Sequence, residues 1–168
     1  VEAPSPLLVA QTAPAIRATR EIRPVAVKSF GDTVYVFDFG ENMAGVCRLS
    51  VQGEKGTKIT MQHGELQKAN GRVEMGNIDI YYKPLPGLAF QTDTYTLKGE
   101  GVETFTPDFT YHGFQYVEVK SDRPVKLNEE SLTALFVHTA VEPVGTFSCS
   151  NELMNKIWKA TNQSYLSN

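Results

Sequence analysis

The sequence predicts an all-β protein, an antiparallel β-sandwich that carries one amphipathic helix at its C-terminal end. Short runs rich in Val, Phe, Tyr and Thr recur from Val25 to Ser148, and turn residues separate them. No helical pattern lies between these runs, which excludes the alternating strands and helices that a parallel sheet requires. With 41% hydrophobic and 21% charged residues, the 168-residue chain has enough apolar side chains for a core.

The first 24 residues predict an extended lead-in across the surface. Pro4, Pro6, Pro14 and Pro24 interrupt regular hydrogen bonding there and leave room for one edge strand. From Val25 onward the composition changes to β-type runs, so we expect the sandwich to begin at this residue.

About ten strands are expected between Val25 and Ser148. The clearest pattern is that of residues 45–51, where Cys47, Leu49 and Val51 fall on one face of an alternating run. The expected strands are 25–30, 33–39, 45–51, 57–63, 78–82, 92–98, 102–105, 115–120, 132–138 and 145–148.

Two segments interrupt this rhythm. Residues 67–76 contain Asn70-Gly71 and predict a hairpin-like loop, and residues 83–89 predict a second long connection. In all-β folds such loops are where ligand contacts concentrate.

The last residues, 149–168, predict an amphipathic helix. Ser150 is the expected N-cap, and Glu152 lies in the first turn, where the helix dipole favours a negative charge. An apolar side that carries Trp and Tyr needs a surface to pack on, so we expect the chain to be a piece of something longer. The residues at helical spacing are Leu153, Met154, Ile157, Trp158, Thr161, Tyr165 and Leu166.

Charge and motifs argue against several classes of function. A net charge of −3 does not suit a nucleic-acid binder, which normally shows a basic patch. No apolar run reaches the 18–20 or so residues of a membrane span, so no membrane partner is expected. The phosphate-binding patterns GxGxxG and GxxxxGK[ST] are absent, and we expect no cofactor.

The two cysteines predict neither a zinc site nor a catalytic thiol. Cys47 and Cys149 are far apart in sequence and form no CxxC pair. Both are expected to be buried free thiols, and a disulfide between them stays open at this point.

Several carboxylates are candidates for acid and base roles, but no pair stands out. Carboxylates near turns are common in any soluble sandwich, so no catalytic pair is predicted. His63 and Glu65 have no third ligand nearby in sequence, and we expect a strand residue with a solvent-facing neighbour rather than a metal site. The carboxylates considered are Asp38, Glu41, Glu65, Asp79, Asp93 and Asp108.

Tyr111 and His112 are the strongest candidates for contact with a sugar. A glycine between aromatic residues after Pro107 predicts a tight bend that exposes both side chains for stacking and hydrogen bonding. The alternative, that neighbouring aromatic residues such as Phe109 and Phe114 simply fill the core, has more weight.

Several segments, read in order, resemble one family. Together they are similar to the bacterial α-L-rhamnosidases of glycoside hydrolase family seventy-eight, and more narrowly to the concanavalin-like β-sandwich that precedes their catalytic helical barrel. The strings FDFGENMAG and FTYHGFQYVEV carry most of this resemblance. The matching segments are Phe37–Gly45, His63–Leu66, Asp93–Gly99, Phe105–Val119 and Gly145–Asn151.

This resemblance implies an enzyme that removes terminal α-L-rhamnose with inversion, using an acid and a base on opposite sides of the sugar. In the family those acids belong to the helical barrel, so no catalytic residue is expected in this chain. The implied domains are a lead-in over 1–24, a sandwich over 25–148 and the start of the helical domain over 149–168. The implied partners are the barrel in cis and, through it, a rhamnose-containing glycan. The unpaired helix also allows self-association.

Two hypotheses of function follow. The first is an accessory sandwich that supports the catalytic barrel. The second is an autonomous carbohydrate-binding module that uses Tyr111, His112, Tyr81 and Tyr82. A third, a stand-alone glycosidase that uses Glu41 or Glu65, has the least support, because fold analogy alone establishes no activity. Exposed aromatic side chains would favour the module, and an apolar face near the helix would favour the accessory role.

Overall fold

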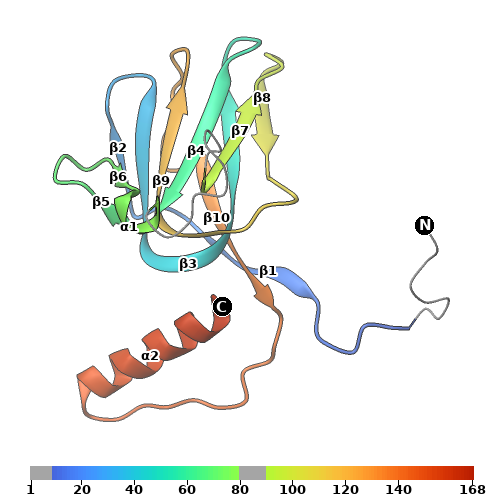
Figure 1. Ribbon diagram of the computed structural model, residues 1–168, viewed down its shortest axis with the longest axis vertical. Helices are drawn as coiled ribbons and strands as arrows, with labels where there is room; N and C mark the ends of the chain where they lie inside the picture. The colour runs from blue at the N-terminus through green and yellow to red at the C-terminus, as the bar shows by residue number, and fades with distance from the viewer. Residues whose placement is uncertain (1–8, 80–89) are drawn as a thin grey trace.

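The architecture is a β-sandwich whose two layers share one long strand, with a helix beside it (Figure 1). The computed structural model describes residues 9–79 and 90–168. Every pairing between the described strands is antiparallel. The elements are β1 (Ile16–Ile22), β2 (Ala26–Ser29), β3 (Val34–Gln52), β4 (Lys58–Gly64), β5 (Leu66–Gln67), β6 (Val73–Glu74), α1 (Gly76–Asp79), β7 (Thr92–Thr96), β8 (Val102–Phe105), β9 (His112–Ser121), β10 (Leu132–Thr139) and α2 (Glu152–Leu166).

Strand β3 connects the layers because it bends in the middle. Its first half pairs with β2 and β9, and its second half pairs with β10 and β8. The register with β9 shifts between Asp38 and Met43, and Gly40 lies in the bend with a φ of 72°. Figure 1 shows this bend at the lower end of the sandwich. The sheet order is β1-β10-β3-β9-β4-β7, with β2 and β8 also on β3.

The prediction of two separate strands, 33–39 and 45–51, is wrong because the two runs form one continuous strand, β3. Residues between them stay extended because Met43 and Ala44 pair with Phe114 and Gly113 on β9. Gly45 allows the close approach of β10, since a Cβ at this position would collide with the carbonyl oxygen of Leu135.

The core lies between the layers and draws on both halves of β3. Alternate residues of the strand point inward, as the period of two requires. Burying aromatic and branched side chains of this size contributes about 1.5–3 kcal/mol each, so this face holds the two layers together. The largest fully buried apolar side chains are Phe37, Phe39, Met43, Leu49, Ile59, Met61, Phe114, Leu132 and Phe136.

Other predicted elements are confirmed or corrected. The lead-in does contain an edge strand, β1, and the predicted loop over 67–76 holds the β5–β6 hairpin. The predicted strand 78–82 is wrong at its start, because Gly76–Asp79 forms the helical turn α1; its remainder and the connection 83–89 lie outside the described residues. The predicted strand 145–148 is also wrong, since this segment pairs with no described strand.

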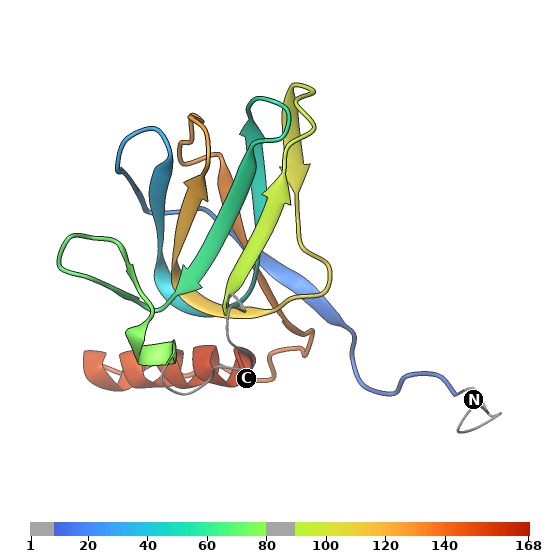
Figure 2. The same cartoon turned by 45° about the horizontal axis from the view of Figure 1, so that its top comes forward.

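Helix α2 is confirmed, but it begins one residue later than predicted. Asn151, not Ser150, is the N-cap, and its side-chain oxygen accepts hydrogen bonds from the backbone of Leu153 and Met154. Figure 2 shows the helix lying across the end of the sandwich where β3 bends. None of its residues, all of which the structure describes, is buried. In the described ranges no helix is long and apolar enough to cross a membrane.

A buried ion pair attaches the β5–β6 hairpin to β9. Arg72 donates two hydrogen bonds to Glu118, of 2.6 and 2.7 Å, and Lys120 lies 2.9 Å from the same carboxylate. The backbone N–H of Val73 donates a further bond of 3.2 Å. Burial by itself raises the pKa of Glu118, but the bonds from Arg72 and Lys120 outweigh it and lower the pKa from 4.5 to about 2.

We predict that Glu118→Gln lowers the free energy of unfolding at pH 7 by about 3 kcal/mol, measured by urea denaturation. The folded pKa lies below the unfolded value, so the stabilisation is complete above pH 4.5 and disappears as the pH falls through about 2. The wild-type and variant curves should therefore converge in acid. The matched control is Glu54→Gln, because Glu54 forms an exposed pair with Arg123 and should change stability by less than about 1 kcal/mol. Equal effects of the two substitutions would contradict the assignment.

Candidate functional site

A cluster of polar side chains is buried at the end of the sandwich near the β3 bend. His63 lies near the end of β4, Asp93 on β7 and His112 at the start of β9. Because β4 pairs with both β7 and β9, three residues that are distant in sequence meet. One donor atom from each lies within 4.8 Å of the other two. All three side chains are at least nine-tenths buried, with exposures of 0%, 8% and 6%.

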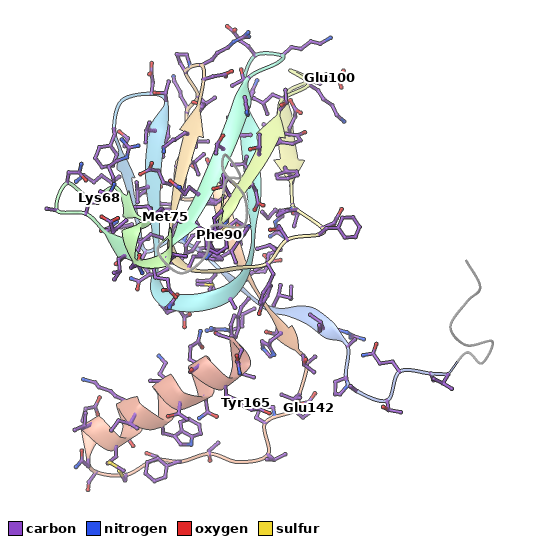
Figure 3. The ribbon with its side chains drawn as sticks, in the orientation of Figure 1. Lys68, Met75, Phe90, Glu100, Glu142 and Tyr165 are labelled. Atoms are coloured by element: carbon purple, nitrogen blue, oxygen red, sulfur yellow. The ribbon has the colours of Figure 1, made fainter. Side chains whose placement is uncertain are left out.

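Gln91 orients both histidines. Its backbone carbonyl lies 3.2 Å from His63 Nδ1, and its side-chain Oε1 lies 2.9 Å from His112 Nδ1. The side-chain amide donates to the carbonyl of Gly113 at 2.9 Å, which leaves Oε1 as the acceptor toward His112. Since a carbonyl oxygen can only accept, each histidine carries a proton on Nδ1. The backbone of Gln91, which brings its two oxygens to the two rings, has a φ of 52°, in the left-handed region that non-glycine residues rarely adopt. Figure 3 places the preceding residue, Phe90, at the lower end of β4 and β7.

His112 and Asp93 form a buried hydrogen bond. The Nε2 atom of His112 lies 3.0 Å from Asp93 Oδ2 and 2.9 Å from the hydroxyl of Thr110. With Nδ1 already protonated, a bare Nε2 would face an ionised carboxylate, and two acceptors would repel at this distance. A proton therefore lies on Nε2 or on Oδ2, and it bridges the two groups.

His63 stacks on His112 and stays neutral. The ring centroids are 4.1 Å apart and the ring planes differ by 21°. Burial first, and then the neighbouring His112, lower the pKa of His63 from 6.5 to about 3. Its Nε2 atom is buried, and among the described residues it has no hydrogen-bond partner. His63 thus presents a free lone pair inside the protein.

The predicted sugar-contact residues divide between surface and interior. Tyr111 is half exposed, and its hydroxyl donates to the carbonyl of Val137 at 2.8 Å. The prediction that His112 is exposed is wrong, because its bonds to Asp93, Thr110 and Gln91 hold it inside. Tyr81 and Tyr82 lie outside the described residues. Of the aromatic neighbours, Phe114 is in the core, but Phe109 is fully exposed.

Three of the other candidate carboxylates, Asp38, Glu41 and Glu65, have structural partners. Glu41 forms an ion pair with Arg20 at 3.1 Å, and Glu65 accepts a hydrogen bond of 2.9 Å from Asn42. Asp38 accepts bonds from Gly40 and Gln115 in the β3 bend. Glu41 and Glu65 also line a cavity of about 510 Å³ between the bend and α2, together with Lys156 and Lys159.

The cysteines are partly as predicted. Cys47 is buried and Cys149 is exposed, so burial is confirmed only for the first. Both are free, which removes the disulfide alternative. Burial, and then the charge of Asp93, raise the pKa of the Cys47 thiol well above 9.0, so it remains protonated and is no thiolate nucleophile.

Sequence comparison decides the family. Residues 28–138, which cover the sandwich from β2 to β10, match the sequence model of the bacterial alpha-L-rhamnosidase concanavalin-like domain. The chain belongs to this family. The all-β fold and the resemblance noted in the sequence are thereby confirmed.

Individual relatives agree with the family match. An alpha-L-rhamnosidase of Streptomyces avermitilis is 36% identical over 89% of this chain and 14% of its own length. One from Formosa agariphila is 34% identical over 88% of this chain and 15% of its own. The chain therefore spans about a seventh of these curated relatives.

Solved structures of two relatives share the fold. The alpha-L-rhamnosidase from Dictyoglumus thermophilum has a TM-score of 0.84 at 39% identity, over 95% of this chain and 17% of its own. The Streptomyces avermitilis enzyme, complexed with L-rhamnose, has a TM-score of 0.81 at 33% identity, over 96% of this chain and 15% of its own.

We predict that His63 stays neutral with its proton on Nδ1 down to about pH 3, and the ¹⁵N shifts of its ring should show this tautomer by NMR. The folded pKa lies below the unfolded value of 6.5, so protonation in the unfolded chain removes stability as the pH falls from 6.5 toward 3. His63→Phe keeps the aromatic stack but cannot titrate. In a buffer that contains EDTA, wild-type stability relative to this variant should therefore fall by about 2 kcal/mol from pH 7 to pH 5. Parallel pH profiles of the two proteins would contradict the prediction.

Proposed function

We propose that this concanavalin-like domain is a non-catalytic part of an α-L-rhamnosidase that removes terminal α-L-rhamnose from glycosides or polysaccharides with inversion. The observation that supports this most is the family match, which covers the sandwich while the chain spans only 14% of its Streptomyces avermitilis relative. Most of such an enzyme lies outside this domain. We expect the acid and the base in that remaining part, in a helical barrel joined in cis.

Helix α2 supports the accessory role. Leu153, Ile157 and Trp158 are 64%, 50% and 39% exposed on a helix that is properly capped and regular. Leaving several large apolar side chains in water is unfavourable, by about 1.5–3 kcal/mol each relative to full burial. The contacts of α2 with the sandwich include a bond of 3.1 Å from Gln163 to the carbonyl of Asn42 and the packing of Leu166 on the core. We infer that residues 149–168 begin the helical domain and that further helices cover this face.

On this proposal the domains are a lead-in over 1–24, a sandwich over 25–148 and the first helix of the catalytic domain over 149–168. The β3 bend faces α2 across the cavity that Glu41 and Glu65 line. The sandwich would then fix the position of the first helix and shape the approach to the catalytic site.

A carbohydrate-binding module is the second candidate. The exposure of Phe109 and Tyr111 supports it, because an exposed aromatic ring can stack on a sugar. The burial of His112 counts against it, since only Tyr111 of the described sugar-contact residues remains accessible.

We predict that the purified chain alone does not hydrolyse an aryl α-L-rhamnoside. The paired carboxylates required for inversion are expected elsewhere in the protein. The positive control is the Streptomyces avermitilis relative with its matching segment replaced by this domain, which should hydrolyse the same substrate. Turnover by the chain itself that Glu41→Gln or Glu65→Gln abolishes would establish the stand-alone glycosidase. Micromolar affinity for L-rhamnose in calorimetry, lost in Tyr111→Ala, would establish the binding module.

We further predict that the chain self-associates with increasing concentration through α2, and that a chain ending at Ser148 is folded and monomeric. The reason is that α2 adds an exposed apolar face but few contacts to the core. Sedimentation equilibrium measures the association and urea denaturation measures the fold. A matched control is Trp158→Glu, which should lower association without truncation. Unfolding of the shortened chain would show that α2 belongs to the sandwich and that the domain boundary is misplaced.

A further inference from the structure

The buried cluster of His63, Asp93 and His112 has two features that its hydrogen bonds to the rest of the sandwich do not explain. The Nε2 atom of His63 is buried without a described partner, although burying an unpaired polar atom is unfavourable. Gln91 also keeps a left-handed backbone conformation in order to reach both rings. Strain of this kind is often found at functional sites.

The arrangement of protons is the one that metal-binding histidines show. A histidine that ligates a metal almost always donates its other ring N–H to a carbonyl or a carboxylate, which fixes the tautomer. Here the Nδ1 atoms of both rings face carbonyl oxygens of Gln91, at 3.2 and 2.9 Å. Both Nε2 atoms therefore point away from Gln91: that of His63 has no described partner, and that of His112 bonds to Asp93 at 3.0 Å and to Thr110 at 2.9 Å.

We propose that His63 Nε2, His112 Nε2 and Asp93 bind a divalent transition-metal ion such as Zn²⁺, with Gln91 as the residue that orients both histidines. Imidazole and carboxylate donors suit Zn²⁺ and its neighbours, whereas Ca²⁺ and Mg²⁺ prefer oxygen ligands alone. The ion takes the place of the proton in the hydrogen bond between His112 and Asp93, and that proton is released on binding. A water molecule completes the coordination.

The donor distances set the movement that binding requires. Ligand atoms around a tetrahedral Zn²⁺ lie about 3.4 Å apart. One ligand atom from each of the three residues lies within 4.8 Å of the other two, so the donors must move closer together when the ion binds. The rings, now stacked at 21°, must tilt so that both Nε2 lone pairs converge on one point. Rotations of the side chains provide this tilt, and Gln91 keeps the Nδ1 edges in place.

The site does not depend on the proposed function, because a metal here would stabilise the sandwich whether or not the parent protein hydrolyses rhamnosides.

The experiment uses the whole 168-residue chain, prepared without a histidine tag and stripped with EDTA. Isothermal titration with ZnCl₂ measures affinity and stoichiometry, and calorimetric melting measures the change in Tm. We expect one ion per chain, a rise in Tm, and a Co²⁺ form with the visible absorption of tetrahedral coordination.

Two variants test the ligands. His63→Phe keeps the stack but removes the unpartnered Nε2 and also the Nδ1 bond to the Gln91 carbonyl. That carbonyl still accepts a bond of 2.8 Å from the backbone N–H of residue 63, so the variant should fold, and it should bind Zn²⁺ at least tenfold more weakly. Asp93→Asn keeps a hydrogen-bond acceptor for His112 and should lose affinity to a similar extent. The matched control is His138→Phe, because His138 bonds to Thr19 away from the cluster and should leave affinity unchanged. Absence of Zn²⁺ binding, or equal affinity of His63→Phe and wild type, would overturn the proposal.

Discussion

The continuous pairing of strand β3 with four other strands is the constraint on which the rest of the structure depends. One backbone contributes to both layers, so the bend near Gly40 sets how the layers face each other. It also sets where β9 begins, since β9 pairs with β3 on both sides of the bend. His112 is the first residue of β9, and its position next to β4 and β7 follows from that register. The buried cluster is therefore a consequence of how the sheet folds over.

The interior of this sandwich combines an apolar centre with a polar end. Most of the core is Phe, Leu, Met and Val, whose burial supplies the main favourable term in folding. At the β3 bend the same interior accepts two histidines and a carboxylate, and nearly all of their hydrogen-bonding atoms have partners. Low polarity strengthens those bonds and makes any unpaired atom costly, so the network both rigidifies this end and leaves His63 Nε2 as its weak point.

Much of the fold was predictable from the sequence, because period-two patterns and turn residues are local signals. The pattern in residues 45–51 and the helical spacing after Asn151 both correspond to observed elements. The joining of two predicted strands into β3 was not predictable, since it depends on pairing with β9 rather than on the residues in the bend. The buried cluster was harder to predict from the sequence than the fold. Asp93 and the histidines were visible as residue types, but nothing local brings them together, and Gln91 gave no signal because its role is set by backbone conformation and by two neighbouring strands.

The double use of Gln91 restricts how this end of the domain can change during evolution. One residue supplies the acceptor for each ring, and its amide must also reach the carbonyl of Gly113. A shorter side chain would release His112, a charged one would alter the proton balance of the cluster, and a shift of its backbone would move both rings at once. Replacement of either histidine removes a bond to Gln91 and changes the stack that holds the other ring. We therefore expect substitutions at positions 63, 91 and 112 to have strongly coupled effects, so that these positions change together.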